Sequence, residues 1–456
     1  MALTNSQTRD IEALLHPYAN ANAVRQTGSQ NITKGEGVYV YDETGKRYLE
    51  GLSGLWCAGL GFSNPELVEA AHKQMSTLPY YHVFTGRTHE PAFELAEKIK
   101  EHLPTQMSRV IYASSGSEAN DTQLKLLWYY NNARGLPQKK KIISRKKAYH
   151  GVTAASASLT GLPFNHMSWD LPFKWVDHLS TPHFAREALP GESEAEFVAR
   201  LAAELEEHII KEGPDTIAAM FAEPIMGAGG VIVPPKAYFP AIKAVLNKYD
   251  IRLVSDEVIT GFCRTGNWFG AETMNMEANS YSMAKQLTGA FMPLSAVAID
   301  AEMADVIEAH SSELGNLGHG YTYGGHPVAC AVALKTIAIL ERDNINQRVR
   351  DNSVHFAKHL AKIAEHELVV ETRHEGMIAA VEFGPKGKFG FEPAGKIGAR
   401  MFEEMRERGV ITRAPGDALA FCPPMIATEA EIDEMFAPME ECMDTVTVWA
   451  KAEGFI

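Results

Sequence analysis

Between about residues 60 and 320, short apolar runs alternate with segments of helical periodicity. The segment 197–209 repeats an apolar residue at every fourth position and is followed by Gly213, and Asn64 with Pro65 has the residue types of a helix start. This alternation predicts an α/β fold with a mostly parallel sheet between helices. The predicted strands are RVIYA (109–113), KKIIS (140–144), IAAMFAE (217–223), IRLVSDE (251–257) and LSAVAI (294–299).

The pattern changes on both sides of this region. GVYVYDETGKRYLEG (37–51) alternates apolar and polar residues around a turn sequence and predicts a β-hairpin. After about residue 330 the chain has amphipathic helices and a few strands, MIAAVEF and GVITRA among them. We therefore expect an N-terminal segment 1–55 that packs with the small domain, a large domain 56–330, and a small α+β domain 331–456.

The charge of the chain bears on its partners. Its 456 residues can bury a large core, and 43 Lys and Arg against 57 Asp and Glu give a net charge of −14. A negative protein is repelled by nucleic acids and anionic membranes, so neither is expected as a partner. The basic cluster within residues 139–147 is expected to be a solvated edge of the fold.

Cysteine usage and the polar N-terminus bear on metals and location. The 5 cysteines are scattered, with no CxxC pair and no zinc-like spacing to histidine, so no metal is expected. MALTNSQTRD lacks the apolar core of a secretory signal, and we find no apolar run of the roughly 20 residues that cross a bilayer. These features predict a cytoplasmic protein.

Polar residues follow several of the predicted strands. Residues 115–117 follow the first strand, Glu223 ends another, and Asp256 ends a third. In open parallel sheets, ligands bind beyond the carboxyl ends of the strands, so these residues are expected to meet in one crevice. Neighbouring strand residues point to opposite faces, and we expect Asp256 to face the ligand and Glu257 to be structural.

Two motifs suggest chemistry but have ordinary alternatives. Ser115, Gly116 and Ser117 form a turn before a helix, where free N–H groups favour a phosphate, although a plain serine helix cap looks the same. Lys285 is a lone lysine among small and apolar residues. Desolvation lowers the pKa of such an amine and makes it nucleophilic, whereas an ordinary lysine extends its ammonium to water.

Several segments together resemble the class III aminotransferases, which bind pyridoxal phosphate. They are YASSGSEANDTQLKL, AYHG, AEPIMGAGGVIVPP, SDEVITGFCRTGNWFG, MAKQLTG with MPLSAV, YTYGGHPVACAVAL and RAPGDALAFCPP, and they run in the family's order from about Gly35 to Pro424. LPYYHVFTGRTHEP and LLWYYNNARGLPQKKKIISRKKAYHG are similar to the amine or ω-amino acid:pyruvate branch, which includes pyruvate-dependent GABA transaminases. The resemblance implies fold type I, with a mostly parallel seven-stranded sheet in the large domain and a smaller α+β domain.

The resemblance also implies cofactor residues. Asp256 pairs with the pyridine nitrogen, while Lys285 forms the Schiff base and moves protons; with Tyr149, which stacks on the ring, they are the implied catalytic residues. Thr322 is implied to reach the phosphate in a neighbouring subunit, so a homodimer or a dimer of dimers with shared active sites is expected. The implied cofactor-binding residues are Ser115, Gly116, Ser117, Tyr149, His150, Glu223, Asp256, Val258, Lys285 and Thr322.

Arg413 resembles the mobile arginine that binds the carboxylate of pyruvate or alanine. Glu223 resembles its alternative partner when the substrate has no carboxylate, and Arg264, a rival arginine, is interpreted as structural. The implied substrate site comprises Tyr18, Trp56, Phe84, Ala228 and Arg413. This aromatic box has no obvious second cation, which favours apolar or arylalkyl amines.

The resemblance implies an aminotransferase with two half-reactions, in which a small amine or ω-amino acid donates and pyruvate accepts. The alternatives are another class III enzyme, such as an aminomutase or a decarboxylase, or a non-catalytic relative that binds the cofactor. The roughly 35 residues before the hairpin are too few for a DNA-binding domain, which disfavours a regulatory relative. Cys263, Gln286 and Gly324 differ from the residues that are common in the family at these positions. These differences bear on the geometry of the loops and on the substrate specificity.

Overall fold

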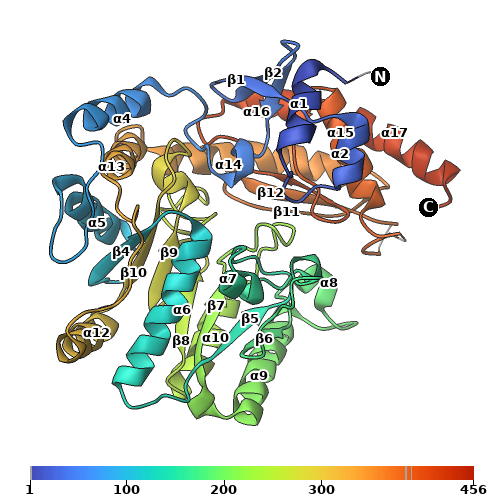
Figure 1. Cartoon of the computed structure of the whole chain (residues 1–456). Helices are drawn as coiled ribbons and strands as arrows, with labels where there is room; N and C mark the ends of the chain where they lie inside the picture. Colours follow the sequence, from blue (N-terminus) through green and yellow to red (C-terminus); the bar gives the residue numbers. More distant parts are fainter. Residues whose placement is uncertain (1–2, 386–387, 392) are drawn as a thin grey trace.

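The large domain is built on a seven-stranded sheet (Figure 1). The structure is a computed structural model that describes residues 3–385, 388–391 and 393–456. The strand order is β4-β10-β9-β8-β7-β5-β6, in which β10 is antiparallel to both neighbours and the other pairs are parallel, as predicted. The strands are β4 (Arg109–Ala113), β5 (Lys141–Arg145), β6 (Val176–Leu179), β7 (Ile217–Ala222), β8 (Arg252–Asp256), β9 (Ser280–Met283) and β10 (Ser295–Ile299).

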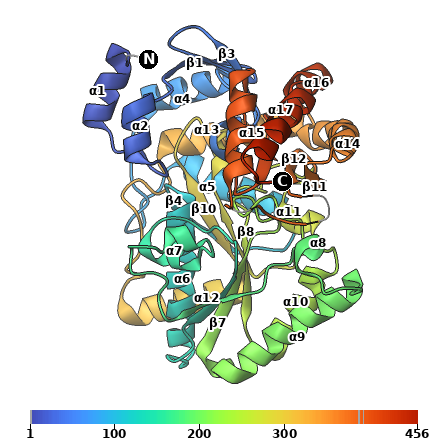
Figure 2. The ribbon, with the colours of Figure 1, turned by 90° about the vertical axis from the view of Figure 1, so that its right-hand side faces the viewer.

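Helices cover both faces of this sheet. Figure 2 shows α6, α7 and α12 on one side of the strands and α9 and α10 on the other. The predicted apolar stripe of α9 is buried, and Gly213 ends this helix. The helices are α6 (Gly116–Ala133), α7 (Ala154–Leu159), α8 (Phe184–Glu187), α9 (Glu194–Glu212), α10 (Tyr238–Lys248), α11 (Gly270–Thr273) and α12 (Ala301–Leu314).

Three further helices pack together beside the sheet: α4 (Pro65–Thr77), α5 (Glu90–His102) and α13 (Pro327–Arg342). The predicted start of α4 is confirmed, because the Asn64 side chain accepts hydrogen bonds from the N–H groups of Glu66 and Leu67. Helix α13 contains the most apolar stretch of the sequence, yet none of the described helices has both the length and the apolar character needed to cross a bilayer.

The remaining elements form two small sheets with helices around them. The predicted hairpin is present as β2 (Tyr39–Asp42) and β3 (Arg47–Glu50), and β1 (Ile32–Glu36) extends it. Strand β13 (Val410–Ile411) pairs with β3, so both ends of the chain share one sheet. The second sheet contains β11 (Val369–Glu375), β12 (Ile378–Phe383) and β14 (Ala418–Phe421). The helices are α1 (Asn5–Ala13), α2 (Ala21–Thr27), α3 (Ser53–Trp56), α14 (Ile345–Ile363), α15 (Lys396–Glu407), α16 (Glu429–Phe436) and α17 (Met439–Ala452).

Three strands differ from the sequence-based expectation. One of them, the edge strand β6 (Val176–Leu179), was not predicted. The predicted strand GVITRA is reduced to two residues, followed by an isolated bridge from Arg413 to Ala420, because Pro415 ends the regular pairing soon afterwards. Strand β9 was not predicted either. Ser280 and Ser282 are buried in it, so its sequence lacks the apolar pattern that usually marks a central strand.

The expected solvated basic edge within 139–147 is wrong for Lys139 and Arg145, whereas Lys146 is exposed. Lys139 is 3% exposed and donates to Asp250 and to the Tyr249 carbonyl, and Arg145 is fully buried and donates to the Glu223 carbonyl. Strand β5 lies inside the sheet and carries Arg145 into the protein, where a carbonyl accepts from it, and Lys139, just before the strand, pairs with a carboxylate and a carbonyl. A run of positive residues in the sequence does not reveal which side chains will be buried.

Candidate active site

The parallel strands bring four groups to one edge of the large sheet. Strand β4 leads to the first turn of α6, β7 ends before Glu223, β8 ends at Asp256, and β9 ends two residues before Lys285. The carboxyl ends of β4, β7, β8 and β9 lie on the same side because these strands run in one direction. The predicted convergence of the strand ends is confirmed, and β9 adds the lysine to it.

Asp256 is held in a fixed orientation by its neighbours. One carboxylate oxygen accepts hydrogen bonds from Asn120 Nδ2 at 2.7 Å and contacts His150 Nδ1 at 2.8 Å. The other accepts from the Val258 N–H at 3.1 Å. Asp256 and His150 are both buried, so these contacts compensate a carboxylate that has little access to water.

Lys285 lies in a left-handed turn with φ of 50°. It is partly exposed, and desolvation lowers the pKa of its amine, while the charges of Asp256 and Glu223 oppose the shift. A lowered pKa increases the fraction of neutral, nucleophilic amine at neutral pH. The interpretation of Lys285 as an ordinary solvent-facing lysine is therefore disfavoured.

The start of α6 offers an anion site. Ser115 caps the helix by accepting from the Glu118 N–H, and the N–H groups of Gly116 and Ser117 have no acceptor among the described residues. A Cβ at residue 116 would lie 3.0 Å from both methyl groups of Val258, so glycine allows Val258 to pack closely against this turn. The Ser117 hydroxyl oxygen accepts from the Val152 N–H and keeps its own proton available for donation.

These features fit pyridoxal phosphate. The open N–H groups of α6 suit its phosphate, the Asp256 carboxylate suits a protonated ring nitrogen, and the Lys285 amine suits its aldehyde. Buried His150 Nε2 has no hydrogen-bond partner in the described structure, which leaves one polar atom beside Asp256 for a bound group.

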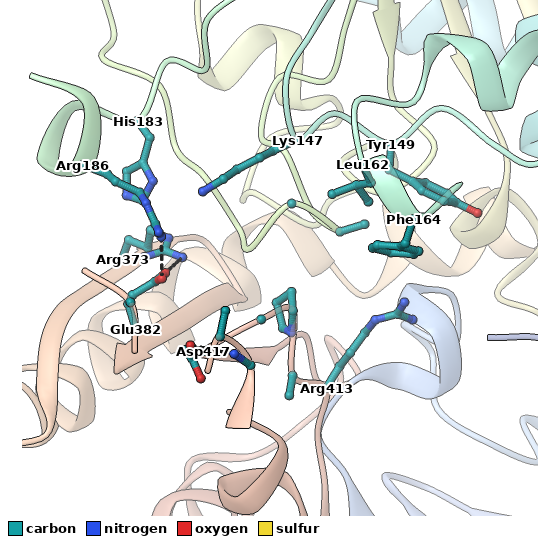
Figure 3. A pocket seen from close by; sticks show the side chains of 18 of the residues that line it. Lys147, Tyr149, Leu162, Phe164, His183, Arg186, Arg373, Glu382, Arg413 and Asp417 are labelled. Atoms are coloured by element: carbon teal, nitrogen blue, oxygen red, sulfur yellow. Dashed lines mark hydrogen bonds and ion pairs between the residues drawn. The ribbon is translucent and has the colours of Figure 1, made fainter. Parts of the chain in front are cut away.

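A cavity of about 370 Å³ lies between the large and small domains. Tyr18, Tyr149, Ala228 and Arg413 line it, and Figure 3 shows the Arg413 guanidinium directed toward the side of Phe164 and Tyr149. Burial, together with the Tyr18 hydroxyl, raises the pKa of Tyr149, so its phenol stays neutral at neutral pH. No carboxylate of the described residues pairs with Arg413.

The expected pairing of Glu223 with Arg413 is not present. Glu223 is 3% exposed, and its two oxygens accept hydrogen bonds from the N–H groups of Tyr149 and Gly227, each at 3.0 Å. The Glu223 carboxylate thus fixes the backbone at Tyr149 and the turn that precedes Ala228. Burial raises the pKa of Glu223.

Of the expected site residues, only Tyr18, Tyr149, Ala228 and Arg413 line this cavity, and the residues around Asp256 and Lys285 lie at the strand edge outside its lining. Three others lie in different surroundings. Trp56 is 2% exposed, packs in the hydrophobic core and does not line the cavity. Phe84 packs against Gly320 in another groove of the same chain. Thr322 is exposed, and its carbonyl accepts a hydrogen bond from the Tyr80 hydroxyl. One chain alone does not bring Phe84 and Thr322 to Tyr149 and Arg413.

Two charged residues beside the site have structural partners. Glu257 points away from Asp256 and accepts from Thr260 and from the N–H groups of Gly270 and Ala271 at the start of α11. Arg264 donates to the carbonyls of Met377 and Pro423, which ties the loop after β8 to the small domain. Both contacts agree with the structural roles expected for these residues.

Sequence reasoning missed Asn120. Its Nδ2 bridges Asp256 and the carbonyl of His150, each at 2.7 Å. Asn120 lies four residues after Gly116, on the same face of α6, so helical spacing from the phosphate motif was the available signal.

One group of potential metal ligands exists among the described residues, although no metal site was expected from the sequence. The Nε2 atoms of His355 and His359 on α14 each lie 2.7 Å from the same oxygen of Asp433 on α16. None of the three lines the cavity described above.

Known proteins resemble this chain over most of its length. The family model described as "Aminotransferase class-III" matches residues 20–443. Gamma aminobutyrate transaminase 1, mitochondrial, of Solanum lycopersicum is 47% identical over 407 residues, which cover 89% of this chain and 79% of that protein.

Solved structures agree with the sequence comparison. The omega transaminase from Pseudomonas jessenii in complex with PMP has a TM-score of 0.95 at 46% identity and covers 98% of this chain and 99% of that one. An omega-aminotransferase from Paracoccus denitrificans has a TM-score of 0.95 at 42% identity, with the same coverage. The match extends over nearly the full chain and includes both domains, and we conclude that this chain belongs to the class III aminotransferases.

Proposed function

We propose that this pyridoxal-phosphate aminotransferase moves an amino group from a primary amine or an ω-amino acid to pyruvate, which becomes alanine. The observation that carries the proposal is an unpaired Arg413 in the same cavity as Tyr149, close to the strand edge that holds Lys285 and Asp256. The relatives support it, since their names include gamma aminobutyrate and omega transaminases, and a similar structure is titled "Transaminase with L-ala".

The cofactor supplies the electron sink that stabilises negative charge on the substrate carbon. Asp256, fixed by Asn120 and His150, keeps a proton on the ring nitrogen. The first turn of α6 would hold the phosphate, and Lys285 Nζ would take the proton from the amine-bearing carbon of the substrate and pass it to C4′ of the cofactor, so that the amino group stays on the cofactor.

Arg413 is proposed to bind the carboxylate of pyruvate through paired, charge-assisted hydrogen bonds. An unpaired arginine can swing toward water when a donor without a carboxylate enters, which avoids burying an uncompensated charge. Tyr18, Tyr149 and Phe164 give the cavity an aromatic wall for the carbon skeleton of the donor.

We also propose that the active unit is a homodimer or a dimer of dimers. Exposed aromatic side chains gather on the loops around Phe84 and Thr322, and the rings of Tyr80 and Tyr323 contact each other edge to face at 5.7 Å. An exposed cluster of this kind is typical of a protein interface. A partner subunit that contributes Phe84 and Thr322 would complete the site.

The test is a donor panel with pyruvate as acceptor, read by alanine formation. We expect the donor alone to change the absorbance of the cofactor and pyruvate to restore it, with one alanine formed per amine consumed. Conversion of the donor without any keto acid would instead favour an aminomutase or a decarboxylase, and absence of any spectral change with amines would contradict the proposed transamination.

A further inference from the structure

The cavity contains a second unpaired cation. Lys147 and Arg413 both line it, and Figure 3 shows them entering from opposite sides. The Lys147 side chain extends toward His183 and Arg186, and no acceptor among the described residues forms a hydrogen bond or an ion pair with its Nζ. The sequence analysis expected no second cation in the substrate site, whereas this cavity contains Lys147 in addition to Arg413.

The backbone fixes the direction of Lys147. Its φ of 64° lies in the left-handed region, which lysine seldom adopts. Its N–H donates to the Gly161 carbonyl at 2.8 Å, and a Cβ at residue 229 would lie 2.3 Å from its carbonyl oxygen. Gly161 and Gly229 thus allow the neighbouring segments to pack closely against the backbone of Lys147. Residues other than glycine with a positive φ, such as Lys147, cluster at functional sites.

Arg186 lies at the same end of the cavity. One of its nitrogens contacts Glu382 at 3.1 Å, and the other guanidinium N–H groups have no partner among the described residues. Burial, followed by the positive charge of Arg186, lowers the pKa of Lys147, while the charges of Glu382 and Glu187 oppose this shift. Two like charges therefore face each other across a space that an anion would stabilise.

The acidic side chains that line this cavity already have partners. Glu382 also accepts from Arg373 at 2.6 Å, and Asp417 accepts from the N–H groups of Gly395, Ile397 and Gly398 near the start of α15. These contacts leave Lys147 without a directly paired counter-ion among the described residues. A ligand carboxylate can supply one.

We propose that Lys147 and Arg186 bind the carboxylate of ω-amino acid donors, while Arg413 is reserved for the carboxylate of the keto acid. This proposal rests on the transaminase function proposed above and specifies its donor class: an amine whose carboxylate is separated from the reacting carbon by a methylene chain. In this proposal the carboxylate of the donor and the carboxylate of the keto acid bind at opposite sides of one cavity.

The experiment compares straight-chain ω-amino acids of increasing length with n-alkylamines of the same length, in wild type and in Lys147→Met. Methionine keeps the volume of the side chain and removes the charge. We expect kcat/KM for the longer ω-amino acids to fall about 10- to 100-fold, mainly through KM, with a much smaller loss for the alkylamines. Lys147→Arg should retain most of the preference, and Lys146→Met, at the exposed neighbouring position, should resemble wild type.

A second measurement tests the subsite without turnover. Calorimetric titration of the holoenzyme with straight-chain dicarboxylates should show an affinity at least about tenfold weaker in Lys147→Met than in wild type. Equal losses for amines and amino acids, or unchanged dicarboxylate binding, would overturn the subsite. Absence of wild-type transamination with every donor, together with an intact difference in dicarboxylate binding, would instead overturn the proposed function alone.

Discussion

At the scale of single residues, the site depends on groups whose charges are set by their surroundings. Asp256 stays oriented because Asn120, His150 and a backbone N–H share its two oxygens. Lys285 shows the opposite condition, since desolvation lowers its pKa and favours the neutral amine. An acceptor that must keep its charge is surrounded by donors, and a nucleophile that must lose its charge is desolvated.

Lys285→Ala should abolish transamination while the fold remains. The variant lacks both the nucleophilic amine and the group that moves the proton, so alanine formation should fall by about 10⁴-fold or more. Circular dichroism and the thermal midpoint should stay close to wild type, and Lys146→Ala serves as a control at an exposed lysine. Turnover of the variant at the wild-type rate would refute the role of Lys285.

Arg413→Ala should slow the half-reaction with pyruvate much more than the half-reaction with an amine that has no carboxylate. Loss of a charge-assisted contact to the carboxylate should lower kcat/KM for pyruvate by about 30- to 1,000-fold, whereas an amine without a carboxylate should lose far less. Stopped-flow absorbance of each half-reaction measures both values, and Arg413→Lys should restore part of the loss. Similar losses in the two half-reactions would argue against selective recognition of the carboxylate.

At the scale of elements, two adjacent carboxylates at the end of β8 have different roles. Asp256 faces the crevice, and Glu257 accepts from the N–H groups at the start of α11 and from Thr260. Burial raises the pKa of Glu257 to about 7, against the hydrogen bonds that lower it. Glu257 therefore joins the strand to the helix that follows, next to the residue that orients the cofactor.

Glu257→Gln should destabilise the protein by about 1–3 kcal/mol, because the amide NH₂ faces backbone donors that need an acceptor. Between about pH 5 and pH 7 the folded protein binds a proton at Glu257 that the unfolded chain has released, so the wild-type free energy of unfolding should fall as pH rises through this range. The variant should show a weaker pH dependence in thermal unfolding, and the exposed Glu272→Gln on α11 should behave as wild type. An unchanged pH dependence in Glu257→Gln would contradict this account.

At the scale of the whole molecule, a single chain holds two incomplete recognition surfaces. The cavity of Tyr149 and Arg413 lies between the domains, and Phe84 lies in a separate groove with Tyr321. Thr322 follows this groove and is exposed. The shared-site dimer proposed above joins the two surfaces across subunits.

Complementation between inactive subunits tests this arrangement. Lys285→Ala removes the amine, and Thr322→Glu places a negative charge where the partner's phosphate is expected, so each homodimer should be inactive or nearly so. A mixed dimer contains one site with native Lys285 and native Thr322, and random mixing should restore up to about a quarter of the wild-type activity. Light scattering verifies dimer formation, and mixtures that stay inactive would contradict shared active sites.

The sequence by itself determined the main sheet, the hairpin and the order of the motifs, because apolar periodicity and turn residues act over short distances along the chain. It also placed Asp256, Glu223 and the first turn of α6 at one edge, since parallel strands must end together. It failed for the edge strand β6, for β9, whose buried serines carry no apolar pattern, and for Lys139 and Arg145 of the basic cluster, whose charges are compensated by residues far away in the sequence.

Only the tertiary structure decided which partner each charged group has. Glu223 bonds to backbone N–H groups in place of Arg413, Asn120 reaches Asp256 from another element, and Lys147 faces a cavity where the acids already have partners. The physical reason is that the cost of burying a charge depends on donors and acceptors brought together by folding, and their distances in space are not encoded in spacing along the chain.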